Sequence, residues 1–438
     1  MTPEPNVEFG FYNTKGELYK TGKTDKNGKL NINLVYGTYT VKQLTTSKDT
    51  TKVDDFTIKV YEMGDKIYYT ISNAEITAKL KVVKIDKDTK QIIARKNIKF
   101  RIYNVDTKEY VKQTITYPTA KTIDVFETDS NGILITPYPL KAGTYYLEEV
   151  DQKIDGYLWN KNSVEFKIGE DSKLINDEEF GILFEVKFEN KAVKGSLELT
   201  KTGEEVELTD NGYIYTKINL KGVKIGLYAR ENIYDALGNL KYKKGTLVKE
   251  LITDENGYVK VDDLYLGKYY LQEIETVNNH VLDKTKYNFN LEYKDQYTEV
   301  INYKTTLENH LPKGTLEFTK SDYSNSKTLP NTLIEIYNEN DELVYSGRTD
   351  ENGKIIIDKL PVGKYYILEK EAPEGYKINE EKMYFEITED GQVVKCNMLD
   401  EAYEVPNTGL SNINYELIGS IVLIVSGLGL FLYGTKKR

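Results

Sequence analysis

Lysine, glutamate and asparagine or aspartate side chains recur at matched positions in three stretches of this 438-residue chain. Each lysine lies in a short segment in which apolar and polar residues alternate, and each glutamate lies in a later segment of the same kind. The asparagine or aspartate lies at the end of the stretch. Asn73, Asn190 and Asn309 each precede the next lysine by eleven residues, since 84−73, 201−190 and 320−309 are equal. The three sets, called here the triads, are Lys84, Glu149 and Asn190; Lys201, Glu273 and Asn309; and Lys320, Glu369 and Asp400.

A lysine, a carboxylic acid and an amide that share the interior of one domain can form a covalent bond. Burial lowers the pKa of an amine and raises that of a carboxyl group, and a desolvated neutral amine is a nucleophile. A protonated glutamate can polarise a side-chain carbonyl and then transfer protons. The product is an amide between lysine Nζ and the side chain, with ammonia released from Asn or water released from Asp. The predicted cross-links are Lys84–Asn190, Lys201–Asn309 and Lys320–Asp400, promoted by Glu149, Glu273 and Glu369.

The fourth stretch and the start of the chain depart from this pattern. An alternative interpretation also exists for each lysine taken alone. The last alternating face of the chain ends at Asp400, with Asn397 as a weaker candidate on the opposite face. Near the start, Asn73 has no lysine-bearing segment before it, and Gln43 stands at the glutamate position, so we expect no cross-link there unless residues before Met1 supply the lysine, and Gln43 argues against a cross-link even then. Taken singly, the three lysines would be interpreted as exposed strand residues, because lysine is rarely buried unless paired.

The elements that must position these residues are β-strands in a repeated unit. A T-D-x-N-G phrase, an alternating segment and a G-x-Y turn recur four times, which indicates a tandem array. Asn-Gly is a strong hairpin signal, and alternating Tyr, Thr, Val and Ile favour strands. No long amphipathic helix is evident. The four copies are Thr24–Gln43, Thr128–Glu149, Thr253–Glu273 and Thr349–Tyr376.

The sequence therefore predicts an all-β fold of tandem antiparallel β-sandwich domains, followed by a C-terminal transmembrane helix. Insertions at residues 112–124 and 232–244 are expected to be surface loops or extra hairpins, and the short linkers predict a stiff array. The predicted parts are an incomplete first repeat at 1–79, complete second, third and fourth repeats at 80–192, 193–311 and 312–402, and a tail at 403–438.

Composition argues against several classes of function. A single cysteine, Cys396, excludes an internal disulfide framework, and two histidines leave little for a zinc site. The net charge of −10 carries no basic face for nucleic acid. The T-D-x-N-G acids lack the alternating ligands of a calcium loop. We expect no metal, no cofactor and no enzyme activity on an external substrate.

The tail has three consecutive features. The motif Val405, Pro406, Asn407, Thr408, Gly409 is followed by an apolar run from Leu417 to Tyr433 and by a basic end at Lys436–Arg438. The run is at the short end of what spans a bilayer, and the basic end would lie on the cytoplasmic side. The start, MTPEP, has no signal-peptide pattern, so residues before Met1 are expected to be missing from a secreted protein.

These residues resemble a known family. The repeats are similar to the Cna-B or SpaA-like domains of Gram-positive surface proteins, and Tyr365–Tyr376 (YYILEKEAPEGY) is their most specific stretch. The resemblance implies an immunoglobulin-like sandwich and self-formed isopeptide bonds at the triads. The tail resembles an LPxTG sorting signal with Val405 in the leucine place. That resemblance implies a sortase that cleaves between Thr408 and Gly409 and joins the Thr408 carboxyl to peptidoglycan or a pilin lysine.

The resemblance implies a secreted, cell-wall-anchored protein of a Gram-positive bacterium that serves as a rigid stalk or adhesin. The alternative is an ancillary or basal pilin subunit in a sortase-assembled pilus. A backbone pilin fits less well, because Tyr117-Pro118-Thr119 lacks the lysine of the usual Y-P-K motif. The expected partners are sortase, peptidoglycan or a pilin subunit, and a host matrix or cell-surface ligand. Contact with the membrane is expected only through the C-terminal helix before sorting.

Overall fold

Every regular element of the described chain is a β-strand. The computed structural model describes residues 3–64, 66–277 and 279–404, and the predicted all-β fold is confirmed over these residues. No helix in these ranges is long and apolar enough to cross a membrane. The predicted C-terminal helix at Leu417–Tyr433 lies outside the described residues.

The chain divides into two compact units, which are described separately. One unit contains residues 1–195, 234–241 and 292–301, and the other contains residues 196–233, 242–291 and 302 onward. The first unit therefore holds the first two repeats together with a hairpin and a loop from the third. The second unit holds the rest of the third repeat and the fourth.

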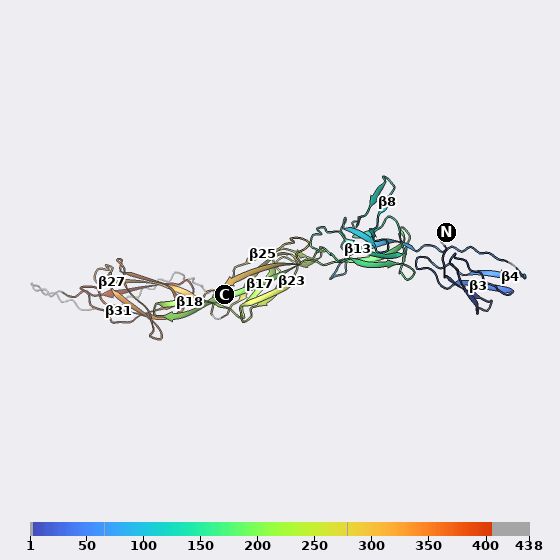
Figure 1. Cartoon of the computed structure of the whole chain (residues 1–438). Helices are drawn as coiled ribbons and strands as arrows, with labels where there is room; N and C mark the ends of the chain where they lie inside the picture. The colour runs from blue at the N-terminus through green and yellow to red at the C-terminus, as the bar shows by residue number, and fades with distance from the viewer. Residues whose placement is uncertain (1–2, 65, 278, 405–438) are drawn as a thin grey trace, which may run out of the picture. The chain divides into compact units, whose positions relative to one another are not determined.

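The first repeat forms one antiparallel sheet in the order β2-β1-β3-β4. Alternate side chains of β3 are buried, as its GTYTVKQ sequence predicts. One face of the sheet packs a small core of Val7, Phe9, Phe11, Tyr39, Val41 and Ile58. The strands are β1 (Glu8–Tyr12), β2 (Leu18–Lys23), β3 (Gly37–Gln43) and β4 (Phe56–Val60) (Figure 1).

The second repeat is a complete sandwich of two sheets around an apolar core. One sheet has the order β10-β6-β13-β14 with β7 beside β6, and the other has the order β11-β5-β16-β15 with β12 beside β5. Its strands are β5 (Thr77–Asp86), β6 (Lys99–Asn104), β7 (Glu109–Tyr110), β8 (Gln113–Ile115), β9 (Lys121–Ile123), β10 (Phe126–Glu127), β11 (Ile133–Ile135), β12 (Leu140–Lys141), β13 (Gly143–Glu149), β14 (Val164–Ile168), β15 (Ile175–Asp177) and β16 (Gly181–Asn190).

The third repeat has the sheet order β22-β19-β24-β25 and a second sheet, β18-β17-β23, in which β26 also pairs with β17. Both predicted insertions form hairpins: β8–β9 in the second repeat (Figure 1) and β20–β21 in the third. The strands of the third repeat are β17 (Lys194–Thr209), β18 (Gly212–Asn219), β19 (Lys224–Ala229), β20 (Ile233–Tyr234), β21 (Leu240–Tyr242), β22 (Leu247–Ile252), β23 (Tyr258–Leu264), β24 (Gly267–Glu275), β25 (Tyr287–Leu291) and β26 (Val300–Glu308).

The fourth repeat pairs the sheet β29-β28-β31-β32 with the sheet β30-β27-β33. Its core includes Phe318, Ile336, Ile367 and Met398. The strands are β27 (Lys313–Asp322), β28 (Leu333–Asn338), β29 (Leu343–Arg348), β30 (Lys354–Pro361), β31 (Gly363–Glu371), β32 (Met383–Ile387) and β33 (Val393–Asp400).

The first and last strands of the second and fourth repeats are neighbours. Strand β5 pairs in parallel with β16, and β27 pairs in parallel with β33. Each of these first strands also pairs in antiparallel fashion on its other edge, with β11 or β30. A cross-link between the first and last strands would therefore join two strands that are already paired.

The T-D-x-N-G turn closes against the first strand of its own repeat. In the fourth repeat, Asp350 Oδ1 accepts the backbone N–H of Asn352 at 2.9 Å and of Lys354 at 2.7 Å. Gly353 has a φ of +69°, and a Cβ atom there would lie 2.9 Å from Lys320 O and 2.8 Å from Leu329 N. Positive φ and crowding by backbone atoms together explain why this position is glycine.

We predict that Gly353→Ala destabilises the fourth repeat by about 2–4 kcal/mol, because backbone strain and a backbone clash add. Gly391→Ala is the matched control. Its φ is +75°, but nothing lies within 4 Å of the added Cβ, so it should cost only about 1 kcal/mol. Calorimetry of the intact chain measures both variants. Equal losses of stability in the two variants would mean that crowding by backbone atoms at Gly353 is not the cause of the destabilisation.

Candidate functional site

The triad of the second repeat converges in the interior of the sandwich. Lys84 lies on β5, Glu149 ends β13 and Asn190 ends β16; their exposed fractions are 0%, 4% and 1%. Lys84 Nζ donates to Asn190 Oδ1 and lies 3.1 Å from Glu149 Oε1. Asn190 Nδ2 donates to Glu149 Oε1 at 3.1 Å. The carboxylate therefore contacts both the amine and the amide nitrogen.

The triad of the third repeat has the same arrangement. Lys201 lies on β17 and Glu273 on β24, and Asn309 directly follows β26. Lys201 Nζ donates to Asn309 Oδ1 at 2.6 Å and lies 3.8 Å from Glu273 Oε1. Asn309 Nδ2 donates to both carboxylate oxygens of Glu273, at 2.8 and 3.0 Å.

The triad of the fourth repeat contains two acids. Lys320 of β27 donates to Glu369 Oε2 of β31 at 2.9 Å and also to Asp400 Oδ1 of β33. All three side chains are fully buried or nearly so. Asn397, the weaker candidate, bonds instead to Ser321 Oγ. Asp400, the acid on the alternating apolar face of β33, is therefore the one that contacts the lysine.

Burial shifts the protonation of these triads towards reactive forms. Desolvation lowers the pKa of Lys84 to about 8, although Glu149 opposes this change. Burial likewise lowers the pKa of Lys201. Burial, assisted by the neighbouring Glu369, raises the pKa of Asp400 to about 7. A neutral amine and a protonated carboxyl are the forms that amide formation requires.

The apolar surroundings account for this desolvation. Lys84 Nζ lies 4.4 Å from the centre of the Phe188 ring and 5.4 Å from that of Phe100. Phe188 is the register partner of Lys84 across the parallel pair, and Asn190 lies two residues further on the same face. The amide therefore reaches the amine because the last strand runs parallel to the first.

Each triad glutamate is also held by the loop that follows its strand. Glu149 Oε2 accepts the backbone N–H of Asn160 at 3.2 Å. Glu273 Oε2 accepts that of Asp283 at 2.8 Å, and Glu369 Oε2 accepts that of Asn379 at 2.8 Å. These donors were not predicted from the sequence, although their offset of ten or eleven residues from each glutamate is a signal that could have identified them.

A second pair was also missed, although one of its members lies within the motif. Tyr376, the last residue of YYILEKEAPEGY, donates its hydroxyl to Asp322 Oδ2 at 2.7 Å. Asp322 lies two residues after Lys320, and hydrogen bonds from Ser324 and Tyr376 lower its pKa to about 2. The loop that positions Glu369 is therefore attached to the lysine strand.

The first repeat lacks this arrangement in its described residues. Gln43 is buried at the glutamate position and its Oε1 accepts the Val53 N–H at 3.0 Å. Asn73 Nδ2 donates to Glu4 Oε2 at 3.0 Å and to Thr46 Oγ1 at 3.1 Å. No described lysine occupies the place of Lys84.

The other candidate features give no second site. The predicted sorting residues Val405, Pro406, Asn407, Thr408 and Gly409 lie outside the described residues. Within the described ranges, no group of three or more His, Cys, Asp or Glu could hold a metal ion. Burial raises the pKa of the Cys396 thiol to about 11, so the thiol stays protonated.

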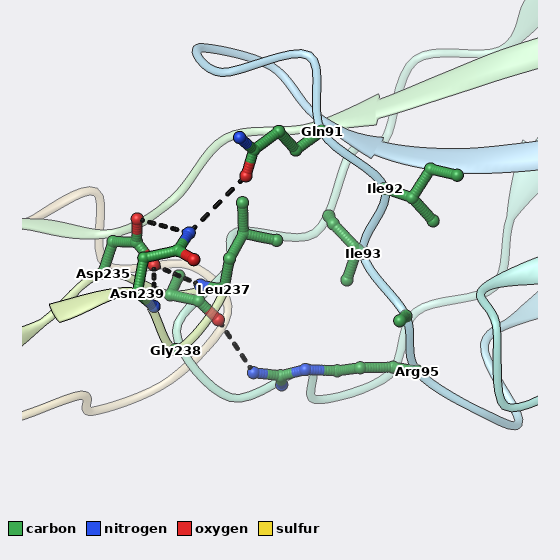
Figure 2. A pocket seen from close by; sticks show the side chains of 10 residues that line it. Gln91, Ile92, Ile93, Arg95, Asp235, Leu237, Gly238 and Asn239 are labelled. Atoms are coloured by element: carbon green, nitrogen blue, oxygen red, sulfur yellow. Dashed lines mark hydrogen bonds between the residues drawn. The ribbon is translucent and has the colours of Figure 1, made fainter.

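A shallow pocket in the first unit is separate from the triads. It is lined by residues 91–95 of the second repeat and 235–239 of the β20–β21 hairpin (Figure 2). Arg95 donates to the Ala236 carbonyl at 3.3 Å, and Asn239 donates to Gln91 Oε1 at 3.5 Å. Because these polar groups hydrogen-bond to each other, they hold the β20–β21 hairpin against the second repeat.

The sequence matches the SpaA prealbumin-like fold domain over residues 2–75, 78–179, 195–306 and 314–402. The chain belongs to this SpaA family. The four matches agree with the four repeats and with the sandwich architecture of the complete ones. No curated protein sequence matches the chain significantly.

Several solved structures are similar to this SpaA chain. The Bacillus anthracis TIE protein is 25% identical with a TM-score of 0.48, over 90% of this chain and 66% of that one. The chain thus spans slightly less than two thirds of that protein. BcpA, the major pilin subunit of Bacillus cereus, is 16% identical over 75% of this chain and 100% of its own, with a TM-score of 0.33. The shaft pilin SpaA of Lactobacillus rhamnosus GG is 14% identical over 49% and 99%, with a TM-score of 0.22.

We predict that Lys84→Met destabilises the second repeat more than the double change Lys84→Met with Glu149→Gln. The single change leaves a carboxylate buried without its cation, which costs about 3–5 kcal/mol, and the double change removes that charge. Trp159, the single tryptophan, donates its Nε1–H to Glu149 O at 3.0 Å. Its fluorescence during denaturant unfolding therefore reports on this repeat. A double variant no more stable than the single one would contradict the buried-charge explanation.

Proposed function

We propose that this SpaA protein is a cell-wall-anchored surface stalk or adhesin whose complete repeats are stapled by self-formed isopeptide bonds. The observation that carries the proposal is the convergence of three separate Lys–Glu–Asn or Lys–Glu–Asp triads. In each triad the lysine Nζ donates to the side-chain oxygen of the predicted partner. The lysines are between 0% and 1% exposed. Lysine is rarely buried unless it is paired, so the burial of three matched lysines is not expected of ordinary surface residues.

In the Asn triads, the neutral lysine amine attacks the side-chain carbonyl carbon of asparagine. In the second repeat, Glu149 contacts both Lys84 Nζ and Asn190 Nδ2, each at 3.1 Å. It can therefore take a proton from the attacking amine and give one to the departing nitrogen. The new bond joins Nζ to Cγ, the old Cγ–Nδ2 bond breaks, and ammonia leaves. Lys201, Glu273 and Asn309 have the same roles in the third repeat.

In the fourth repeat, the leaving group is water. The raised pKa of Asp400 keeps a fraction of that carboxyl protonated near neutral pH. Glu369 Oε1 and Asp400 Oδ2 are buried without a hydrogen-bond partner among the described residues. Lys320 Nζ attacks Asp400 Cγ, one carboxyl oxygen leaves with two protons, and Glu369 transfers them.

The bonds would make each repeat resistant to unfolding. They would connect the first and last strands of a repeat. A tensile force applied to the two ends of that repeat would then be carried by a covalent bond and not by the hydrogen bonds between strands. A link across about 100 residues also restricts the unfolded chain. It is single-turnover chemistry within one molecule, and we propose no activity on an external substrate.

Anchoring completes the proposal. The motif Val405–Gly409, the apolar run and the basic end support a sortase that transfers the Thr408 carboxyl to peptidoglycan or to a lysine of a pilin subunit. The protein would then be displayed on the surface of a Gram-positive cell. A host matrix component or cell-surface molecule is the proposed ligand class of the stalk or adhesin.

An ancillary or basal pilin subunit is the second candidate. Membership of the SpaA family favours it, and BcpA and the Lactobacillus shaft pilin are pilin subunits by name. Denaturing gels of wall extracts separate the two candidates. A ladder of covalent multimers containing this chain supports the pilin, and a single anchored species supports the stalk.

We predict that the intact mass of the chain falls short of its translated mass by two ammonia molecules and one water. Peptide mapping should find Lys84–Asn190, Lys201–Asn309 and Lys320–Asp400 links. Glu149→Ala, Glu273→Ala and Glu369→Ala should each restore one loss, because the proton-transfer group is gone. A mass equal to the translated sequence would refute the cross-links. Lys96→Ala, a change of a lysine outside all triads, is the control and should keep all three losses.

We predict that Thr408→Ala prevents wall attachment in a sortase-bearing Gram-positive host. The proposed acyl transfer occurs at the Thr408 carboxyl, and the recognition site is altered. Fractionation should find the variant in the membrane or medium, with the wild-type chain released only by wall hydrolases. Ser411→Ala, which changes a hydroxyl residue just outside the motif, is the matched control and should stay attached. Continued attachment of Thr408→Ala would contradict the sorting signal.

A further inference from the structure

The loop that follows Glu149 contacts a segment of the third repeat. Residues 151–160, called here the glutamate loop, end at Asn160, whose backbone N–H donates to Glu149 Oε2 at 3.2 Å. Residues 292–299, called here the bracing loop, connect β25 to β26 of the third repeat. Both loops belong to the first compact unit.

The bracing loop holds the start of the glutamate loop at Asp151, two residues after Glu149. Tyr297 donates its hydroxyl to Asp151 Oδ2 at 2.5 Å, and Gln296 Nε2 donates to Asp151 Oδ1 at 3.0 Å. These two hydrogen bonds lower the pKa of Asp151. The carboxylate is therefore ionised at neutral pH, and hydrogen bonds to an ionised acceptor are stronger than those between neutral groups.

The bracing loop also holds the end of the glutamate loop. Tyr293 donates its hydroxyl to Tyr157 O at 2.9 Å. The backbone N–H of Trp159 donates to Gln296 O at 3.0 Å, and the rings of Trp159 and Tyr297 pack edge to face with their centres 6.4 Å apart. Both ends of the glutamate loop are thus attached to one segment of the third repeat.

The end that is held in this way is the part of the loop that contacts Glu149. Trp159 Nε1–H donates to Glu149 O at 3.0 Å, and the next residue, Asn160, supplies the N–H on the carboxylate. A shift of these adjacent residues would displace the carboxylate that must transfer protons between Lys84 and Asn190. A misplacement of about 1 Å in a reacting group can lower a rate by about 100-fold.

The corresponding loops of the other two triads have attachments within their own repeats. In the fourth repeat, Tyr376 donates its hydroxyl to Asp322 Oδ2 on β27 at 2.7 Å. In the third repeat, His280 Nε2 lies 2.9 Å from the Glu204 carbonyl oxygen on β17. These attachments do not involve the bracing loop, so the third and fourth triads serve as internal references.

We propose that the bracing loop positions the reaction centre of the second repeat, so that the Lys84–Asn190 bond forms rapidly only when β25 and β26 of the third repeat are in place. This inference rests on the proposed isopeptide chemistry and goes beyond it, because it makes the reaction of one repeat depend on the folding of the next. The bond changes stay the same: Nζ–Cγ forms, Cγ–Nδ2 breaks and ammonia leaves. Tyr293, Gln296 and Tyr297 are positioning residues, since they act through the glutamate loop.

The test follows cross-linking in the intact chain during cell-free synthesis. Samples are quenched in acidic denaturant, and peptide mapping gives the linked fraction of each triad over time. The double change Tyr293→Phe with Tyr297→Phe removes two hydroxyl donors and keeps both rings. It should slow the Lys84–Asn190 bond at least about fivefold, the value of one net hydrogen bond. The bonds of the third and fourth triads should form at the wild-type rate.

A matched control removes two hydroxyl groups elsewhere. Tyr138 of the second repeat and Tyr234 of the third are 42% and 48% exposed and lie outside both loops. The double change Tyr138→Phe with Tyr234→Phe should leave all three rates unchanged. A slower Lys84–Asn190 bond in this control, equal to that in the bracing-loop variant, would overturn the proposal.

Hydrogen exchange separates positioning from general destabilisation. It is measured in chains that carry Glu149→Gln, in which the proposed bond cannot form. The bracing-loop double change should increase exchange within residues 151–160 and leave β5 and β16 as protected as before. Faster exchange throughout the second repeat would mean that the change only destabilises the fold, and would overturn the positioning role.

The rates also distinguish the two levels of the argument. A wild-type chain that never forms the Lys84–Asn190 bond would refute the proposed cross-link, and this inference with it. A wild-type chain that forms the bond at the same rate as the bracing-loop variant would refute the positioning role alone.

Discussion

The burial of a lysine amine beside a glutamate is the interaction on which the complete repeats depend. Removing an ammonium group from water is costly unless a carboxylate pairs with it or it loses its proton. In the second repeat both compensations are present, because Glu149 lies 3.1 Å from Lys84 Nζ and burial lowers the lysine pKa to about 8. The same desolvation that makes the lysine expensive to bury makes it a nucleophile.

The fold supplies this environment through the pairing of first and last strands. A parallel pair places the end of β16 beside Lys84, and the other sheet contributes Glu149 from β13 across the core. The loop after each glutamate then donates a backbone N–H to the carboxylate. Three separate parts of each repeat must therefore be folded before the amine, the acid and the amide can meet. Under the proposed chemistry, the covalent bond forms only in a folded repeat.

The described residues of the first repeat differ from the complete repeats at these positions. Residues 30–35 and 66–73 belong to no strand, and apolar residues such as Ile71 are exposed. Glutamine at position 43 replaces the acid and leaves a buried amide nitrogen without a partner among the described residues. Sequence analysis predicted an incomplete repeat from the missing lysine segment and Gln43. The sequence pattern gave no indication that residues 30–35 and 66–73 would form no strand.

The period, the strand-rich character and the identity of the converging residues all follow from local patterns in the sequence. Alternating apolar positions and Asn-Gly turns specify strands through local sterics. Four copies of the T-D-x-N-G motif reveal the tandem repeats. The fixed spacing of eleven residues between Asn190 and Lys201 linked the ends of neighbouring repeats. Even the assignment of Asp400 over Asn397 followed from alternation alone.

Which strands are neighbours and what each buried group contacts depend on how distant segments pack together. The parallel pairing of β5 with β16 joins segments that lie far apart in the chain, and no local pattern encodes the direction of that pairing. The Tyr376 hydroxyl on Asp322 is likewise a contact that no local pattern encodes. Burial, and with it the pKa of Lys84 and Asp400, depends on side chains contributed by both sheets. Sequence periodicity fixes the face on which a residue lies, whereas desolvation depends on everything that packs against that face.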